Sequence, residues 1–136
     1  MKLKIQNAKE LDTNAKVTLQ ASGKLGFSDG ARKKMNIESG KFLVIATNEE
    51  DNTDENLYAW LEENDEGGGF KINKGGTYYN ASTKPLFDKM GIDYNDKEKL
   101  VIYDILDFQY EDQKIFKLMK RVRKRAVKQK TGDTNN

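Results

Sequence analysis

The stretch from residue 16 to residue 45 constrains the fold of this 136-residue chain more than any other stretch. Apolar and polar residues alternate from residue 17 to residue 21, as they do in a half-buried strand. Gly23 then interrupts the alternation and predicts a turn, because glycine adopts backbone conformations that other residues avoid. A short apolar segment at residues 25–27 predicts a second strand after that turn.

A short helix and a strong strand complete this stretch. Ser28 or Asp29 can cap the helix, whose inward residues would be Ala31 and Met35. Residues 42–46 are rich in β-branched and aromatic side chains and predict a strand. The predicted order is strand, turn, strand, helix and strand, and we find no catalytic group within it.

The middle of the chain predicts a hairpin that ends at a glycine-rich boundary. Residues 56–63 place their small and aliphatic side chains on one face of a strand. We expect this strand to pair with residues 42–47, across an acidic loop. Residues 64–69, with three consecutive glycines, predict a turn and the best internal boundary.

The next residues repeat the first unit. Two short strands are predicted within residues 70–80, on either side of a glycine pair. Residues 81–90 predict a short helix with Pro85 in its first turn, where the missing N–H costs least. Residues 100–105 predict a strong strand, and residues 108–110 continue it or start another.

The repeated order indicates an internal duplication. The alignment matches residues 42–46 with 100–104, and residues 56–61 with 114–119. The alternative is two unrelated stretches that share common turn chemistry. With the duplication, the fold class is α+β and mainly β: a small barrel of two repeated β-α-β-β units with short helices and a basic C-terminal extension.

The two ends of the chain are less sharply defined. Residues 2–5 predict a strand. Residues 113–130 fit either an amphipathic helix or a closing strand that ends near residue 121 and continues as a basic tail, and we favour the strand, with residues 110–113 as the turn before it. The predicted division is an N-terminal segment at 1–15, a first unit at 16–66, a second unit at 67–121 and a tail at 122–136.

Composition excludes several kinds of chemistry. The chain has no cysteine and no histidine, which removes disulfides, thiolate chemistry and the usual general base near neutral pH. No P-loop or other phosphate-binding glycine motif is present. We therefore expect no enzyme, no cofactor and no metal. No apolar run is long enough for a membrane span, so we expect a cytoplasmic protein, or a virion-associated one if a phage encodes it.

Charge is strongly separated along the chain. Every charged residue from 48 to 66 is acidic, and every charged residue from 113 to 130 is basic. The net charge of +2 hides this asymmetry. A run of basic residues without acids is typical of segments that bind polyanions, because binding releases counterions. The acidic segment, in turn, is a candidate surface for a protein partner.

Several short motifs within residues 16–45 resemble a known family. They include Gly23-Lys24, Ala31-Arg32 and Met35-Asn36-Ile37, followed by a glycine turn and a strand. These pieces resemble the AbrB/MazE/MraZ-type DNA-binding domain. Members of that family usually contribute one unit each to an interleaved dimer, whereas this chain carries two, so the resemblance implies a single-chain pseudo-dimer barrel. Ser28, and Asn80 in the repeat, stand where the family usually has proline.

The resemblance also implies a set of DNA contacts. In the family, basic groups of the glycine turn and the following helix touch DNA, which points to Lys24, Arg32 and Lys41. Neighbouring basic residues in the two units extend this set to Lys33, Lys34, Lys71 and Lys74. For any one lysine, a solvated surface charge is the alternative interpretation.

The basic C-terminal segment supplies the second set of nucleic-acid candidates. These are Lys117, Lys120, Arg121, Arg123, Lys124, Arg125 and Lys128. The leading hypothesis is a non-enzymatic nucleic-acid-binding protein of the transcription-regulator or DNA-coating type, with DNA favoured over RNA. The alternatives are a segment that docks on the chain's own acidic loop, and a structural or interaction module of a phage or other large assembly, or an antitoxin-like adaptor.

Two aromatic residues are candidates for stacking on unpaired bases. Tyr58 and Trp60 fall opposite the apolar face of their strand, although aromatic residues in small barrels more often pack across strands. The nearby acids Asp51, Asp54 and Glu55 lack the glycine and the glutamate that an EF-hand loop requires. We therefore interpret them as a solvated loop.

Overall fold

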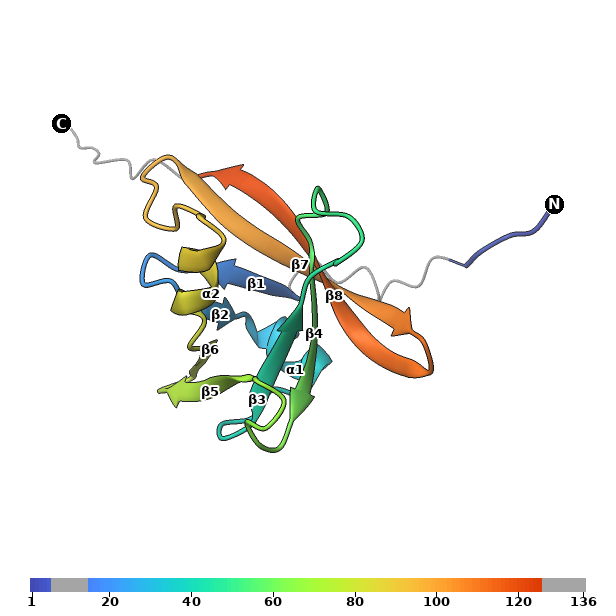
Figure 1. Cartoon of the computed structure of the whole chain (residues 1–136), viewed down its shortest axis with the longest axis horizontal. Coiled ribbons are helices and arrows are strands. Elements are labelled where there is room, and N and C mark those ends of the chain that lie inside the picture. Colours follow the sequence, from blue (N-terminus) through green and yellow to red (C-terminus); the bar gives the residue numbers. More distant parts are fainter. Residues whose placement is uncertain (6–14, 126–136) are drawn as a thin grey trace.

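Eight strands and two short helices make up residues 1–5 and 15–125, the part of the chain that the computed structural model describes (Figure 1). The first half consists of β1 (Lys16–Leu19), β2 (Leu25–Phe27), α1 (Asp29–Met35), β3 (Phe42–Ala46) and β4 (Leu57–Glu62). The second half consists of β5 (Phe70–Gly75), β6 (Tyr78–Ala81), α2 (Lys84–Lys89), β7 (Lys99–Tyr110) and β8 (Gln113–Lys124). The predicted mainly β, α+β class is confirmed, and each unit carries two strands before its helix.

The strands close into a barrel in the order β1-β2-β6-β5-β3-β4-β8-β7. Every strand has one neighbour from its own half and one from the other half. The two halves correspond strand by strand: β1 to β5, β2 to β6, β3 to β7 and β4 to β8. If corresponding strands are exchanged, the neighbouring pairs stay the same, because β1–β7 becomes β5–β3 and the pairs β2–β6 and β4–β8 are unchanged. Closure thus removes the sheet edges that a single unit would expose.

The barrel core follows the alternation seen in the sequence. Val17 and Leu19 of β1 point inward, as do Leu57 and Ala59 of β4, and all four are buried. The helices contribute Ala31, Met35 and Phe87 to the same core. Burial on this scale is the main stabilising term for a chain of this size.

A buried threonine ties the two halves together. The Oγ1 of Thr83, which precedes α2, donates a hydrogen bond of 3.0 Å to the carbonyl oxygen of Gly23. Gly23 lies in the β1–β2 turn with a φ of 85°, the left-handed conformation that its predicted turn requires. The start of α2 in the second half is thereby fixed to a turn of the first.

The predicted alignment of residues 56–61 with residues 114–119 is wrong, because it places residues from opposite faces of β4 and β8 at matching positions. It matched Leu57 with Ile115, but Leu57 belongs to the barrel core whereas Ile115 faces Phe108 outside the core cluster. Leu57 is directly opposite Leu118, and both side chains point into the barrel. A shift of one residue moves a side chain to the other face of a sheet, so such slips matter.

The hairpin of β7 and β8 is longer than predicted. It pairs over its whole length, from Tyr110 opposite Gln113 to Lys99 opposite Lys124. The pairing with β1 covers residues 102–104 and the pairing with β4 covers residues 116–118, so both ends of the hairpin extend beyond these neighbours (Figure 1). The predicted turn at residues 110–113 is confirmed.

Two expectations for the chain ends are wrong. The closing strand continues to Lys124, past the predicted end near residue 121, so the amphipathic helix is excluded over Gln113–Lys124. Residues 2–5 form no strand, and Leu3 and Ile5 are exposed. Neither helix in the described ranges has the length and apolar character needed to cross a membrane.

Candidate nucleic-acid interface

Helix α1 carries three of the predicted DNA-contacting residues. Its N-cap is Ser28, one of the two caps that the sequence allowed, and the Ser28 Oγ accepts a hydrogen bond of 3.1 Å from the backbone N–H of Ala31. The same oxygen accepts a bond of 2.9 Å from the N–H of Lys16, which anchors the helix to β1. Because Ala31 and Met35 face the core, the basic residues between them lie on the outer side of the helix.

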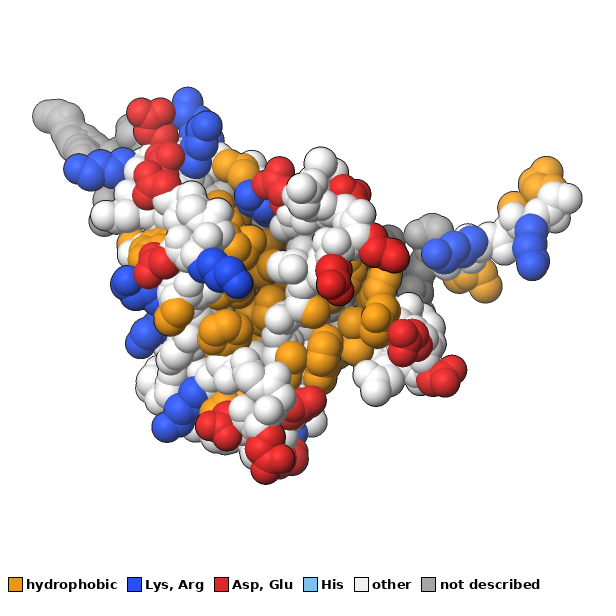
Figure 2. Space-filling model, viewed as in Figure 1, with side chains coloured by type: hydrophobic (Ala, Val, Ile, Leu, Met, Phe, Trp, Pro, Cys, Tyr) orange, Lys and Arg blue, Asp and Glu red, His pale blue; other side chains and the backbone are white. Residues whose placement is uncertain are grey.

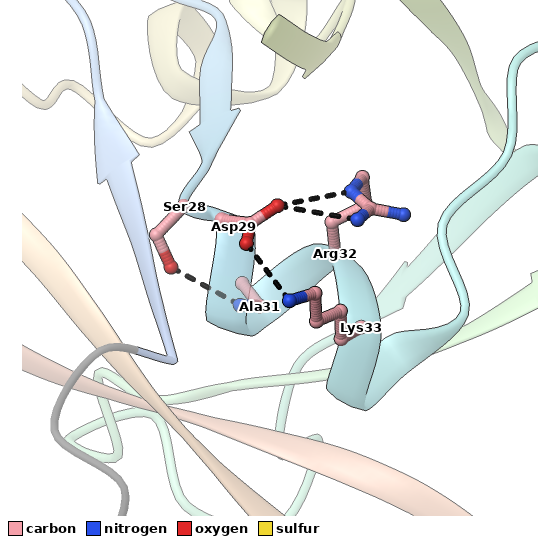
Figure 3. A network of polar contacts seen from close by, with 5 residues as sticks. All are labelled: Ser28, Asp29, Ala31, Arg32 and Lys33. Carbon is pink, nitrogen blue, oxygen red and sulfur yellow. Dashed lines mark hydrogen bonds and ion pairs between the residues drawn. The ribbon is translucent and has the colours of Figure 1, made fainter. Parts of the chain in front are cut away.

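Asp29 forms ion pairs with two of these basic residues (Figure 3). Its Oδ1 lies 3.2 Å from Nη2 of Arg32, and its Oδ2 lies 3.1 Å from Nζ of Lys33. Hydrogen bonds from Lys33 and then Arg32 hold the pKa of Asp29 below its usual value. The carboxylate thus stays charged and reduces the net charge of this group of three residues to +1.

Tyr79 brings cations from both halves together. The guanidinium of Arg32 in α1 lies 5.9 Å from the centre of the Tyr79 ring, and Nζ of Lys74 in β5 lies 5.7 Å from it. Each distance is within the range of a cation–π contact. The predicted residues Arg32 and Lys74 therefore belong to one basic cluster around β6.

Lys34 and Lys41 do not join this cluster. Nζ of Lys34 lies 3.9 Å from the Asp107 carboxylate, and Nζ of Lys41 lies 3.7 Å from both Glu38 and Glu63. Their side chains are only 18% and 19% exposed. Both lysines are neutralised within the protein, which makes them poor candidates for a phosphate contact.

Lys24 immediately precedes β2 and Lys71 belongs to β5, and these two strands flank β6. Lys24 follows the β1–β2 turn and Lys71 lies in β5, and both are exposed. No carboxylate lies within ion-pair distance of either lysine among residues 1–5 and 15–125. Both are available to an external anion.

Part of the basic C-terminal segment is neutralised by the protein's own acids. Nζ of Lys120 lies 2.5 Å from Glu55, and Nε of Arg121 lies 2.7 Å from Asp104. These hydrogen bonds keep the pKa of Glu55 below its usual value and that of Arg121 above it. The partner of Lys120 belongs to the acidic segment, as in the intramolecular alternative, whereas Arg121 pairs with an acid of β7 outside that segment.

The open end of the β7–β8 hairpin keeps a net positive charge. Lys124 is directly opposite Lys99, and Arg123 is the neighbouring residue on β8. Neither Arg123 nor Lys124 has a carboxylate within ion-pair distance in the described part of the chain. Arg125 donates from Nε to the carbonyl oxygen of Asp96 at 2.6 Å, and the Asp96 carboxylate is an electrostatic neighbour of both Arg125 and Lys99. Lys128 lies outside the described residues.

Tyr58 and Trp60 lie on the outer face of β4 and are anchored by acids. The Tyr58 hydroxyl donates a hydrogen bond of 2.7 Å to Asp54, and Nε1 of Trp60 donates one of 3.1 Å to Glu62. The hydrogen bond from the Tyr58 hydroxyl, with further ones from the Asn56 backbone N–H and the Asn48 side chain, lowers the pKa of Asp54 to about 2. The Asp54 bond, followed by burial, raises the pKa of Tyr58 to about 12.

The same two aromatic residues line a cleft of about 570 Å³. Phe108 and Tyr110 of β7 complete its aromatic wall, and Glu49 lies on its rim. Tyr58 and Phe108 pack with their ring centres 5.1 Å apart and their planes tilted by 59°. The predicted stacking residues are therefore brought together with aromatic partners, in surroundings that are acidic.

Sequence reasoning missed Lys99, Phe108 and Tyr110. The first could have been found from the predicted turn at residues 110–113, because counting back along both strands places Lys99 opposite Lys124. The two aromatic residues join Tyr58 only because β8, which pairs with both β4 and β7, brings their outer faces together. No signal within residues 56–63 indicated this.

Comparisons with known proteins give the chain no relatives. No protein-family model, no curated protein and no solved structure matches it. The resemblance to the AbrB/MazE/MraZ-type domain therefore stays a prediction. In the described ranges, no group of three or more acidic residues is arranged to hold a metal ion.

Proposed function

We propose that this protein is a non-enzymatic nucleic-acid-binding protein, of the transcription-regulator or DNA-coating type. The observation that carries the proposal is the open end of the β7–β8 hairpin, where Lys99 and Lys124 are directly opposite each other. Arg123 and Arg125 flank Lys124, so four cations gather at this end of the hairpin, with the single carboxylate of Asp96 beside two of them. The cluster of Arg32 and Lys74 around Tyr79 offers a second basic surface.

Like charges directly opposite each other destabilise a strand pair. A phosphate placed between Lys99 and Lys124 would offset this repulsion and release bound counterions, which gives strongly salt-dependent affinity. Phosphate contacts of this kind position a protein on nucleic acid without reading its sequence. We therefore expect broad recognition of DNA, with most of the affinity supplied by electrostatics.

The test is a salt titration of duplex DNA binding, followed by fluorescence anisotropy. Replacing Lys124 by Gln should lower affinity and reduce the steepness of log K against log salt by about 1. The matched control is Lys114→Gln, which removes the same charge from the same strand at the other end of the hairpin. We expect that control to leave the slope unchanged.

Two results would contradict the proposal. One is weak binding of the unaltered protein to both DNA and RNA at low salt, after nuclease treatment has removed carried-over nucleic acid. The other is an equal loss in Lys124→Gln and Lys114→Gln, which would reduce the effect to net charge alone. Circular dichroism of each variant shows whether the fold is intact.

A further inference from the structure

The aromatic cleft has the composition of a site for a positively charged group. Its wall is formed by Tyr58, Trp60, Phe108 and Tyr110, and its rim by Glu49 and neighbouring polar residues, including Glu50. Figure 2 shows hydrophobic side chains gathered between the β3–β4 loop and the tip of the β7–β8 hairpin, with acidic side chains on both sides. A contiguous apolar surface with a polar rim is typical of an interaction site.

The aromatic rings are held in fixed orientations. The Tyr58 hydroxyl and the Trp60 indole N–H both donate to carboxylates, so their polar groups are already satisfied. What these two residues offer to a ligand is the face of each ring, which carries partial negative charge. Tyr110 is 54% exposed and stands at the end of the wall, at the hairpin tip.

Lys117 of the chain itself places its ammonium group against two rings of the aromatic wall. Nζ of Lys117 lies 6.0 Å from the centre of the Tyr58 ring and 5.9 Å from that of Phe108. Lys117 does not line the cleft, which lies beside it. Ring faces and carboxylates both attract cations and repel phosphates, so this site disfavours base stacking, the candidate role of Tyr58 and Trp60.

We propose that the cleft binds an arginine- or lysine-bearing segment of a partner protein. The argument is charge complementarity: Glu49 and Glu50 would pair with the basic side chains while the aromatic wall packs against their stems and charged groups. This function is separate from nucleic-acid binding, because it uses the acidic face of the protein and not the basic end of the β7–β8 hairpin. Either proposal can fail without the other.

The single tryptophan of the chain, Trp60, lies in the cleft and reports on binding by its fluorescence. The probe is a hexa-arginine peptide, added to the full chain at low ionic strength, and we expect a saturating change in emission. Replacing Glu49 and Glu50 by Gln should weaken binding by about fivefold or more. The matched control is Asp65→Asn with Glu66→Gln, which removes two charges from the β4–β5 turn, and it should bind nearly as well as the unaltered protein.

A second pair of variants tests the aromatic wall. Tyr110→Ser should weaken peptide binding by about two- to fivefold, the range of an exposed cation–π contact. Tyr78→Ser is its control, because Tyr78 is a 74% exposed tyrosine of β6 that does not line the cleft. Both side chains are exposed, so both variants should fold.

Three outcomes would overturn the inference. The first is no saturating change of Trp60 emission with hexa-arginine. The second is an equal loss of binding in the two double variants, or in the two tyrosine variants, which would mean non-specific attraction. The third is a saturating change with a short oligothymidylate that Tyr110→Ser removes, since this would identify the cleft as a single-strand-binding site.

Discussion

Tyr103 provides a sharp test of the packing of the barrel. Its side chain is fully buried, with the ring centre 6.4 Å from that of Phe87, and its hydroxyl has no hydrogen-bond partner among the described residues. Burial raises the pKa of Tyr103 above its ordinary value, because the phenolate would be poorly solvated. A buried hydroxyl without a partner costs about 1–3 kcal/mol. Tyr103→Phe keeps the ring and removes this cost, so the free energy of unfolding should rise by about 1 kcal/mol.

The measurement is urea unfolding followed by circular dichroism, with thermal unfolding as a second probe. A gain of about 1 kcal/mol corresponds to a rise of about 4 °C in Tm for a domain of this size. The matched control is Tyr94→Phe, which removes a hydroxyl that donates to Asp88 at 2.6 Å and should lower stability. If Tyr103→Phe lowers the free energy of unfolding by 1 kcal/mol or more, the hydroxyl is hydrogen-bonded in solution and the reasoning is wrong.

Three further predictions follow from single contacts. Hydrogen bonds, first from a tyrosine hydroxyl, lower the pKa of Asp54 to about 2 from an ordinary 3.8, so this group stabilises the fold above about pH 4 and loses its effect as the pH falls through 2. Asp54→Asn should therefore flatten the plot of Tm against pH in that range, and an unchanged plot would contradict this assignment. A Cβ at Gly69 would lie 2.8 Å from a β3 side chain, so Gly69→Ala should cost about 1–3 kcal/mol in urea unfolding, whereas Gly75→Ala, in open space, should cost almost nothing. Thr83→Val should lose about 1–3 kcal/mol by leaving the Gly23 carbonyl without its donor, and Thr83→Ser should lose less in the same assay.

Local patterns were enough to place most of the elements. The cap at Ser28 and the inward residues Ala31 and Met35 define α1 correctly, because both depend on neighbours within a few residues. Pro85 marks the first turn of α2, as expected, and Gly91, with a φ of 70°, follows the C-cap residue of this helix. The order of elements in the two halves was predicted for the same reason.

Long-range pairing was not accessible from the sequence. The length of β8 depends on β7 lying beside it, since Arg123 and Lys124 have no helix- or strand-specific pattern of their own. Equally, nothing near Lys120 or Arg121 indicates that Glu55 and Asp104 neutralise them. Charge runs in a sequence therefore overstate the number of cations without an acidic partner, and Arg123 and Lys124 at the open end of the hairpin are among those of the run that have no ion pair within the described residues.

The barrel's pairing scheme has a consequence for synthesis on the ribosome. Each strand of the first half needs a partner from the second half, and the last strand to emerge, β8, pairs with β4. A nascent chain that ends at the glycine turn after β4 has four strands, each still lacking a neighbour. The barrel can therefore close only after β8 has emerged, and until then the unpaired strand edges are exposed to pairing with other chains.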